Sequence, residues 1–476
     1  MPTKFRRAGP GPQVGALCLV MAACASLPPA PVARVAKSPQ AYQTARSFAA
    51  PQGEWPKDDW WSAYGDPQLD MLMSEALSGS PSLAQAEARL IKAQATTARA
   101  RSALLPQISG NGDIQEAKQS YKYFIPQTFL PPGYQDYAQA TLNLSWELDF
   151  WGKNRAVIAA ASSRAQAAAA DAAEARLILT TDIATAYATL AQLYADRDVG
   201  DEAVKLRRET AALVSQRVTN GLDTQAELQQ AKAGAPATLA NVAAIDEQIA
   251  LTRNELAALL GEGPDRGLSI SRPAPPRLGQ FALPADLKID LIGRRPDIVA
   301  ARWRAAAAVK DVTGAKAQFY PDISITGFIG QQSLHLSELF APGADFGAIG
   351  PAISLPIFDG GRLRANLRGA QADRQAAVAA YDQAVTEALH QVADAADSER
   401  ALDSRLSQSR LALESYEQAY RVARLRYEGG LSTFQSVLLA EDAVLSQRRI
   451  VTDLQSRGLV LDIALVRALG GGFRQS

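Results

Sequence analysis

The sequence predicts a mainly α-helical chain with a membrane β-barrel portion, built by internal duplication. Two parts of the 476-residue chain resemble each other, and from Gly152 onward their matched motifs keep a constant offset of 209 residues. Each part contains a strand-like alternation of apolar and polar residues, followed by a proline-free helical stretch much longer than a globular helix. Alanine supplies much of the 47% hydrophobic fraction, which favours long packed helices over a conventional core of bulky side chains.

The composition excludes several classes of function. The 49 basic and 49 acidic side chains balance, so no basic excess is present to bind nucleic acid. Two cysteines are too few for a disulfide scaffold or a four-thiolate zinc site. The two histidines, His335 and His390, are expected at the surface or in packing rather than on a metal. No motif gathers a nucleophile, a base and an orienting group, so we expect no enzyme, no bound metal and no nucleic-acid partner.

The first 23 residues are typical of a bacterial signal peptide. Basic residues near the start precede an apolar run at 14–23, which is too short to cross a bilayer as a helix. The run ends in MAAC, which resembles the lipobox in which the cysteine, here Cys24, is lipidated and becomes the mature N-terminus. The alternative is an ordinary cleaved signal with a chance cysteine. We expect a lipoprotein signal peptide over residues 1–23 and a covalent lipid on Cys24, with no other cofactor.

The residues after Cys24 predict where the mature chain is held. Ala25 is not the aspartate that typically retains such lipoproteins in the inner membrane, so the outer membrane is expected. Residues 24–55 are rich in proline and alanine without periodicity, which predicts a lipidated, extended N-terminal tether.

The duplication divides the rest of the chain. Its matched motifs include GLDT, beginning at Gly221, and GLST, beginning at Gly430. We expect a first structural repeat with N-terminal helices over 56–270, an inter-repeat linker over 271–294, a second structural repeat over 295–470 and a C-terminal tail over 471–476.

Each repeat is expected to begin with a helix and continue as a β-hairpin. The helices are expected at 82–104 and 297–319, and Pro106 and Pro321 end them. Apolar and polar residues then alternate, most clearly at 141–150, which predicts strands with one apolar and one polar face. Two such hairpins give four strands per chain.

The strands have the length of barrel strands that cross a bilayer, about ten residues. Four strands cannot close a barrel, and an open sheet edge is not tolerated in hydrocarbon, so several chains must complete it. Two chains would give eight strands and a lumen filled by side chains, whereas three would give twelve strands and a wide aqueous lumen. We therefore expect strands from several chains to form one barrel in outer membrane lipid. The alternative is a pair of soluble hairpins that cap a coiled-coil stalk.

A very long helix is expected after each hairpin, at 152–218 and at 361–427, each on the order of 100 Å long. Such rods need lateral partners, and the second contains a coiled-coil seam with alternating spacings of four and three residues. The seam residues are Leu402, Leu406, Ser409, Leu413, Tyr416, Tyr420, Ala423 and Tyr427. A turn and a returning helix follow each rod. The four rods per chain would extend the barrel away from the membrane as a helical tunnel.

A series of motifs recurs in order along nearly the whole mature chain. They are WW at 60–61, DPQL at 66–69, LLPQ at 104–107, SWELD at 145–149, RRPDI at 294–298 and LPIFDGG at 355–361. They resemble the outer membrane factor family, in its lipoprotein branch of TolC-like and NodT-like multidrug efflux channels. The resemblance implies a homotrimer with one twelve-stranded barrel and a periplasmic α-helical tunnel. It also implies passive conduction of drugs or other small molecules, docking to a periplasmic adaptor, and energy supplied by an inner-membrane pump.

The tips of the helical hairpins are the candidate docking sites. Gly221 and Gly430 lie where a left-handed turn residue is expected, and the resemblance implies that the tips contact the adaptor and line the entrance. The alternative is that these glycines are only turns. The candidate tip residues are Arg217, Gly221, Leu222, Thr224, Arg426, Tyr427, Gly430, Leu431 and Thr433.

Other conspicuous residues are expected to be structural. Arg294, Arg295 and Asp297 predict a hub at the repeat junction, and Trp60 and Trp61 predict a packing anchor for the N-terminal arm.

One family feature is missing from the sequence. Many relatives place an aspartate at the closed entrance where this chain has Leu439. Glu441 and Asp442 lie nearby, but a shift of two or three positions along a helix turns them to another face.

Two other functions remain open from the sequence. One is the outer membrane exit duct of type I protein secretion, which uses the same fold. The other is a non-conducting, lipid-anchored coiled-coil scaffold between envelope layers, which predicts no ion current.

Overall fold

The computed structural model describes residues 34–118, 120, 122, 127–129, 132–285 and 287–475. Cys24 lies outside these residues, so its lipidation stays a prediction. The chain forms two compact units: unit 1 contains residues 91–167 and 301–381, and unit 2 contains residues 37–90, 168–300 and 382–476. Within the described residues, no helix combines the length and the apolar character that a membrane-spanning helix needs.

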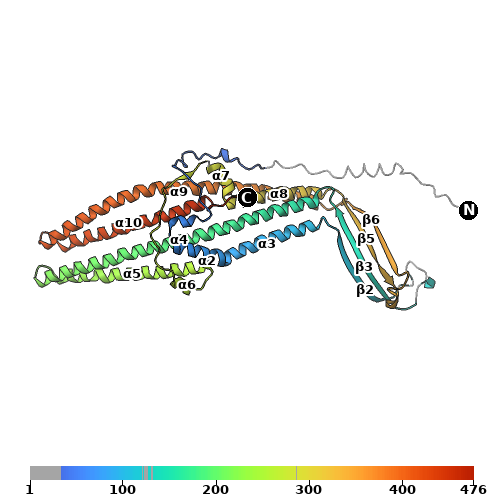
Figure 1. Ribbon diagram of the computed structural model, residues 1–476, viewed down its shortest axis with the longest axis horizontal. Coiled ribbons are helices and arrows are strands. Elements are labelled where there is room, and N and C mark those ends of the chain that lie inside the picture. Colours follow the sequence, from blue (N-terminus) through green and yellow to red (C-terminus); the bar gives the residue numbers. More distant parts are fainter. Residues whose placement is uncertain are drawn as a thin grey trace. The chain divides into compact units, whose positions relative to one another are not determined.

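Unit 1 contains a four-stranded antiparallel sheet (Figure 1). Its strands are β2 (Gln107–Ala117), β3 (Gln135–Leu148), β5 (Asp322–Ser333) and β6 (Asp345–Ser354). Their order is β2-β3-β5-β6, so both predicted hairpins are confirmed, and pairing of β3 with β5 joins them into one sheet. Among the described residues, β2 and β6 each pair on one side only.

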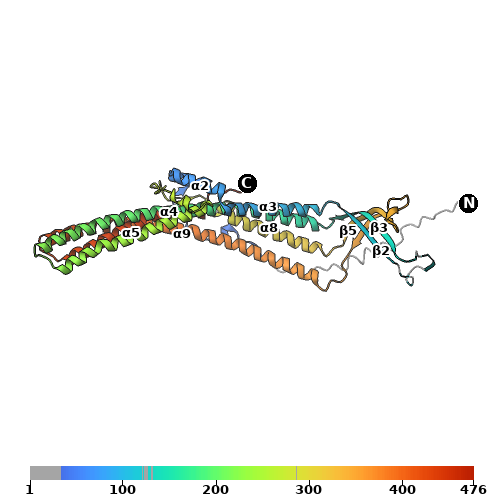
Figure 2. The same ribbon diagram turned by 90° about the horizontal axis from the view of Figure 1, so that it is seen from below.

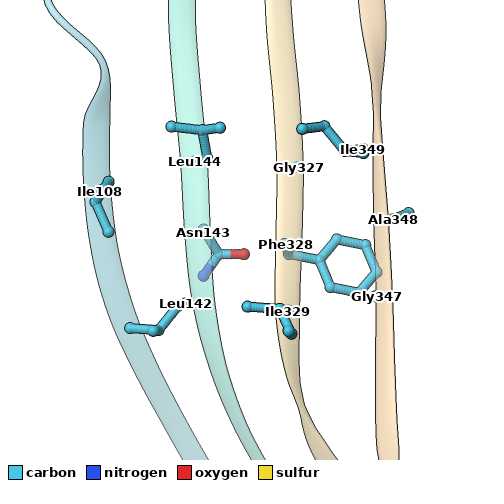
Figure 3. A pocket seen from close by; sticks show the side chains of 10 residues that line it. All are labelled: Ile108, Leu142, Asn143, Leu144, Gly327, Phe328, Ile329, Gly347, Ala348 and Ile349. Atoms are coloured by element: carbon cyan, nitrogen blue, oxygen red, sulfur yellow. The ribbon is translucent and has the colours of Figure 1, made fainter.

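The sheet has one apolar face because side chains alternate along each strand and the register aligns the apolar positions. Ile108 pairs with Leu144, and Leu142 pairs with Ile329. Figure 3 shows apolar side chains from neighbouring strands around one hollow of the sheet. Several are more than half exposed, including Ile108, Leu142, Ile329 and Ile349. The chain therefore leaves this apolar face uncovered.

The opposite face of the sheet is largely polar. Asn143 of β3 lies on it, and so do Ser324 and Thr326 of the neighbouring strand β5. The exception is a pair of phenylalanines, Phe328 and Phe346, whose ring centres lie 5.2 Å apart. The predicted two-faced strands are therefore confirmed.

Two helices of 67 residues each, α4 (Lys153–Thr219) and α9 (Arg362–Glu428), confirm the predicted long helices. Each turns back into a second helix, α5 (Gln225–Leu260) or α10 (Phe434–Ala468), as Figure 2 shows. The predicted returning helices are therefore present, with 36 and 35 residues, about half the length of the helices that they follow. Glycines with positive φ follow both of them and end them, Gly261 at 83° and Gly470 at 90°.

The predicted coiled-coil seam of α9 is confirmed only in part. Leu402 is buried against Leu454 and Leu461 of α10, and Tyr427 is also buried. Tyr416, in contrast, is 43% exposed. A strict 4,3 spacing therefore overestimates how much of this face is covered within one chain.

The remaining elements are the helices that begin the two repeats and several shorter elements. They are β1 (Gln52–Gly53), β4 (Leu283–Pro284), α2 (Pro67–Gly79), α3 (Pro81–Ser102), α6 (Asp265–Leu268), α7 (Leu287–Arg294), α8 (Pro296–Ala317) and 3-10 helices at Pro39–Ala41, Trp60–Tyr64, Gln127–Phe129 and Leu336–Glu338. Trp60 and Trp61 are buried in a cluster with Leu72, Met73 and Ile183. The predicted packing anchor is confirmed.

The repeat junction is a buried polar hub in unit 2, as predicted. Arg295 is 6% exposed, and its Nη2 lies 2.6 Å from Asp297 Oδ2. Its Nη1 donates to Gln391 of α9 at 2.8 Å and to the carbonyl of Ala468 in α10 at 3.0 Å. One guanidinium therefore joins the start of the second repeat to both of its long helices.

Candidate functional site

The turns at the two hairpin tips have the same backbone geometry. Gly221 and Gly430 have φ of 74° and 71°, and the residue after each donates its N–H to the carbonyl five residues earlier, at 2.9 and 2.7 Å. This is the Schellman ending, which needs a left-handed residue. Thr224 then caps α5 in a reciprocal capping box with Glu227, and Thr433 is the N-cap of α10.

A polar network joins one tip to the other. Arg217 Nε in α4 lies 3.0 Å from Asp223 Oδ2, and its guanidinium lies 4.3 Å from the ring centre of Tyr427 in α9. The hydroxyl of Tyr427 donates to Asp223, and Arg217 also donates to the carbonyl of Glu428 at 3.2 Å. Burial, and after it the Asp223 carboxylate, raise the pKa of Tyr427. The phenol therefore stays protonated as the donor that holds the tips together.

The structure divides the predicted tip residues into two groups. Tyr427 is 1% exposed and the Arg217 side chain is 11% exposed, so both side chains contact the other tip rather than solvent. The remaining residues form what we term the exposed tip surface: Gly221, Leu222, Thr224, Arg426, Gly430, Leu431 and Thr433. Its apolar side chains, Leu222 and Leu431, are 62% and 72% exposed.

Asp223 is a tip residue that the sequence prediction missed. The second copy has Ser432 at the matching position, and Tyr427 matches Val218 in the first copy. These two mismatches between otherwise similar tips were the available signal for a contact between the tips. An acid present in one copy alone and a phenol present in the other copy alone can pair with each other.

A second polar layer lies between the two helical hairpins. Glu441 in α10 is fully buried; its Oε2 accepts from the Thr210 hydroxyl at 2.6 Å, and its Oε1 lies 3.0 Å from Arg207 Nε in α4. Arg207 also pairs with Asp442. Burial raises the pKa of Glu441, and Thr210 and Arg207 oppose that rise. Leu439 is 61% exposed, so Glu441 lies on another helix face, as predicted.

The two histidines are exposed, and each lies 3.4 Å from one aspartate: His335 from Asp136, and His390 from Asp394. In the part of the chain that the structure describes, no group of three or more His, Cys, Asp or Glu side chains is placed to hold a metal ion.

We expect Asp223→Ala to loosen the tips, because Arg217 and Tyr427 both lose their shared acceptor. Hydrogen bonds to a charged group contribute about 1.5–3 kcal/mol, so amide exchange near residues 214–228 and 424–434 should become about 10- to 100-fold faster. Ser432→Ala, at the matching position of the other tip, should leave it unchanged. Equal exchange in the two variants would show that the network does not hold the tips.

Comparison with known proteins places this architecture in a family. The outer membrane efflux protein family matches residues 72–262 and 289–471. The multidrug resistance outer membrane protein MdtP of Escherichia coli O6:H1 is 33% identical over 434 residues, which cover 88% of this chain and 87% of MdtP. The fusaric acid resistance protein FusA of Burkholderia cepacia is 37% identical over 372 residues, 75% of this chain and 68% of FusA.

A solved structure shares the fold. The outer membrane protein VceC of Vibrio cholerae is similar with a TM-score of 0.83 and 44% identity, over 88% of this chain and 100% of that chain. The resemblance seen in the sequence motifs is therefore confirmed, and this chain belongs to the outer membrane efflux protein family.

Proposed function

We propose that the chain is the passive exit duct of a tripartite efflux system and works as a homotrimer. Drugs or other small molecules enter it from a periplasmic adaptor and an inner-membrane pump, which supplies the energy. The observation that carries the proposal is the uncovered apolar face of a sheet in a member of an outer membrane efflux family. Within the described part of the chain, each edge strand of this sheet pairs on one side only.

The open edges of the sheet favour a trimer. Strands β2 and β6 would leave unpaired backbone groups in hydrocarbon, which is not tolerated. Pairing β6 of one copy with β2 of the next closes the sheet, and three copies give twelve strands around a water-filled lumen.

The surface of α9 also favours a neighbouring copy. Leu367 packs against Val312 of α8, and the helix face opposite this contact holds small, exposed residues. They are Ala365, Gly369, Ala372, Ala376 and Ala380. Small side chains leave room for a second helix to approach closely, as a wall of helices from several chains requires.

The N-terminal arm runs in the direction that a lipid on Cys24 requires. Arg400 of α9 donates to the carbonyl of Ser47 at 3.1 Å, and the backbone N–H of Lys37 donates to Asp382 at 2.9 Å. From Ser47 toward Lys37, the arm thus runs along α9 toward the N-terminal end of this helix, which is the end connected to β6. This direction supports the proposed anchoring of Cys24 in the membrane that the sheet crosses.

The exposed tip surface is the proposed docking site for the adaptor. Leu222 and Leu431 offer apolar contacts there, whereas Arg217 and Tyr427 act indirectly by holding the tips in place. The names of MdtP and FusA, which refer to multidrug and fusaric acid resistance, support a small-molecule cargo.

Conduction by the purified protein tests the proposed function. In planar bilayers we expect a steady single-channel current, because a twelve-stranded barrel encloses water. The scaffold alternative predicts no current, and its absence from protein shown to be folded and inserted would overturn the proposal.

Crosslinking tests the docking surface separately. Cysteines replacing Leu222 and Leu431 should form adducts with the periplasmic adaptor of the same efflux system. A cysteine replacing Tyr134, which is 66% exposed in the connection between β2 and β3, is the control with matched exposure. Adducts at all three positions, or at Tyr134→Cys alone, would defeat the docking assignment.

A further inference from the structure

The helical segments of unit 1 carry an excess of positive charge for which conduction and docking give no reason. We term these segments the basic belt: residues 91–102, 153–167, 301–317 and 362–381. They contain 14 lysines and arginines but only two aspartates, although the whole chain has no net charge. The rest of unit 1, residues 103–152 and 318–361, contains nine acidic and two basic residues. Charge is therefore segregated within the unit.

Most of the basic side chains in the belt are exposed. Several basic side chains of the belt form ion pairs, among them Lys153 with Glu147 and Asp322, Arg155 with Asp149, and Arg164 with Asp311. In α9, Arg364 and Arg368 are exposed and form no ion pair with any carboxylate that the structure describes. The fold of a single chain therefore does not explain these two cations.

The basic residues also occur where a helix disfavours them. Lys153 and Arg155 lie in the first turn of α4, and Arg362 and Arg364 lie in the first turn of α9; neither turn contains an acid. The positive end of the helix dipole favours anions there. A capping aspartate precedes each helix, but the basic pair is repeated at the same offset in both copies. In α4 both basic side chains form the ion pairs given above, so the first-turn charge that the fold leaves unexplained is that of α9.

The belt adjoins the uncovered apolar face of the sheet. At the junctions between strands and helices, large apolar side chains are exposed: Leu105, Phe150, Trp151, Ile357 and Phe358. Figure 1 shows these junctions, where β3 leads into α4 and β6 leads into α9. Along unit 1 the surface thus changes from apolar to aromatic and then to basic. A lipid leaflet has the same order, from hydrocarbon through the interface to the phosphate groups.

We propose that the basic belt binds the phosphate groups of anionic phospholipids in the leaflet that borders the helices. The proposal rests on the membrane placement of the sheet given above. Exposed arginines suit this partner because a guanidinium donates two hydrogen bonds to a phosphate, and long side chains can reach the interface from the helix surface. The belt would hold the duct at a fixed depth.

Native mass spectrometry of the full-length protein in detergent tests this proposal. The test variant replaces three exposed arginines of α9 in the belt, Arg362→Gln, Arg364→Gln and Arg368→Gln. The control makes the same charge change farther along the same helix, Arg405→Gln, Arg410→Gln and Arg421→Gln. With added cardiolipin, we expect the test variant to retain about tenfold less lipid than the control, which should match the unmodified protein. Phosphatidylethanolamine and inorganic phosphate are the comparison probes.

The other outcomes decide against the lipid. Equal loss of cardiolipin in both variants, or equal retention, would overturn the proposal. A shift in the reversal potential of the channel with unchanged lipid retention would instead assign the arginines to the lumen. Replacing the same three residues by lysine keeps the charge and should retain cardiolipin, which guards against misfolding of the glutamine variant. Because retention is measured apart from current, a conducting channel that fails to bind lipid would refute the belt assignment and leave the proposed function intact.

Discussion

Replacing Arg207 by methionine is expected to destabilise the contact between the two helical hairpins by about 3–5 kcal/mol, the cost of leaving a buried charge without its partner. Glu441 is fully buried, and Arg207 is the cation placed 3.0 Å from it. The single hydrogen bond from Thr210 does not neutralise the carboxylate. Amide exchange in α4 and α10 around these residues should become at least about 100-fold faster.

Two variants give this prediction its controls. Arg208→Met removes an exposed neighbouring charge and should change the exchange little. Arg207→Met combined with Glu441→Leu removes both charges, and it should restore most of the protection, because a buried ion pair can be replaced by apolar residues at little cost. If the double variant were as labile as the single one, the buried carboxylate would not be the cause.

Gly470→Ala is expected to destabilise the repeat junction by about 4 kcal/mol or more. A Cβ at Gly470 would lie 2.0 Å from the carbonyl oxygen of Arg294, and φ at this glycine is 90°. Either the end of α10 or the segment before Arg295 must move, which would break the hydrogen bonds of the buried hub. Thermal unfolding of the purified protein, followed by circular dichroism, should shift to clearly lower temperature.

Gly430→Ala is the matched control, because it separates backbone strain from steric collision. Gly430 also has a left-handed φ, 71°, but beyond the glycine and its two chain neighbours no heavy atom of the described residues lies within 4 Å of the position of its Cβ. It should cost only about 1–2 kcal/mol, the strain of an L-residue in this conformation. Equal shifts for the two variants would mean that the collision with Arg294 is relieved without loss of the hub.

The elements of this fold could be predicted from the sequence because their signals are local. Alternation along 141–150 indicates a two-faced strand regardless of its partner, and the long proline-free stretches indicate α4 and α9 within two residues of their ends. The tip glycines at 221 and 430 were predictable for the same reason, since a left-handed turn residue follows from the helix ending itself.

The contacts between elements could not be predicted in the same way. The pairing of Asp223 with Tyr427 joins residues 204 positions apart, and the burial of Glu441 depends on which face of α10 meets α4. A 4,3 spacing placed Tyr416 in a seam, although one chain alone leaves it 43% exposed. Helix faces are periodic in the sequence, but their partners are selected by packing, which a single sequence does not encode locally.

Because the two tips differ in sequence, the tip surface of a trimer would have threefold rather than sixfold symmetry. One tip supplies Asp223 where the other has Ser432, and one supplies Tyr427 where the other has Val218. In the proposed trimer, six hairpin ends would therefore alternate between two kinds around the mouth. A ring of six identical adaptor subunits could not engage them equivalently: three would occupy one type of position and three the other.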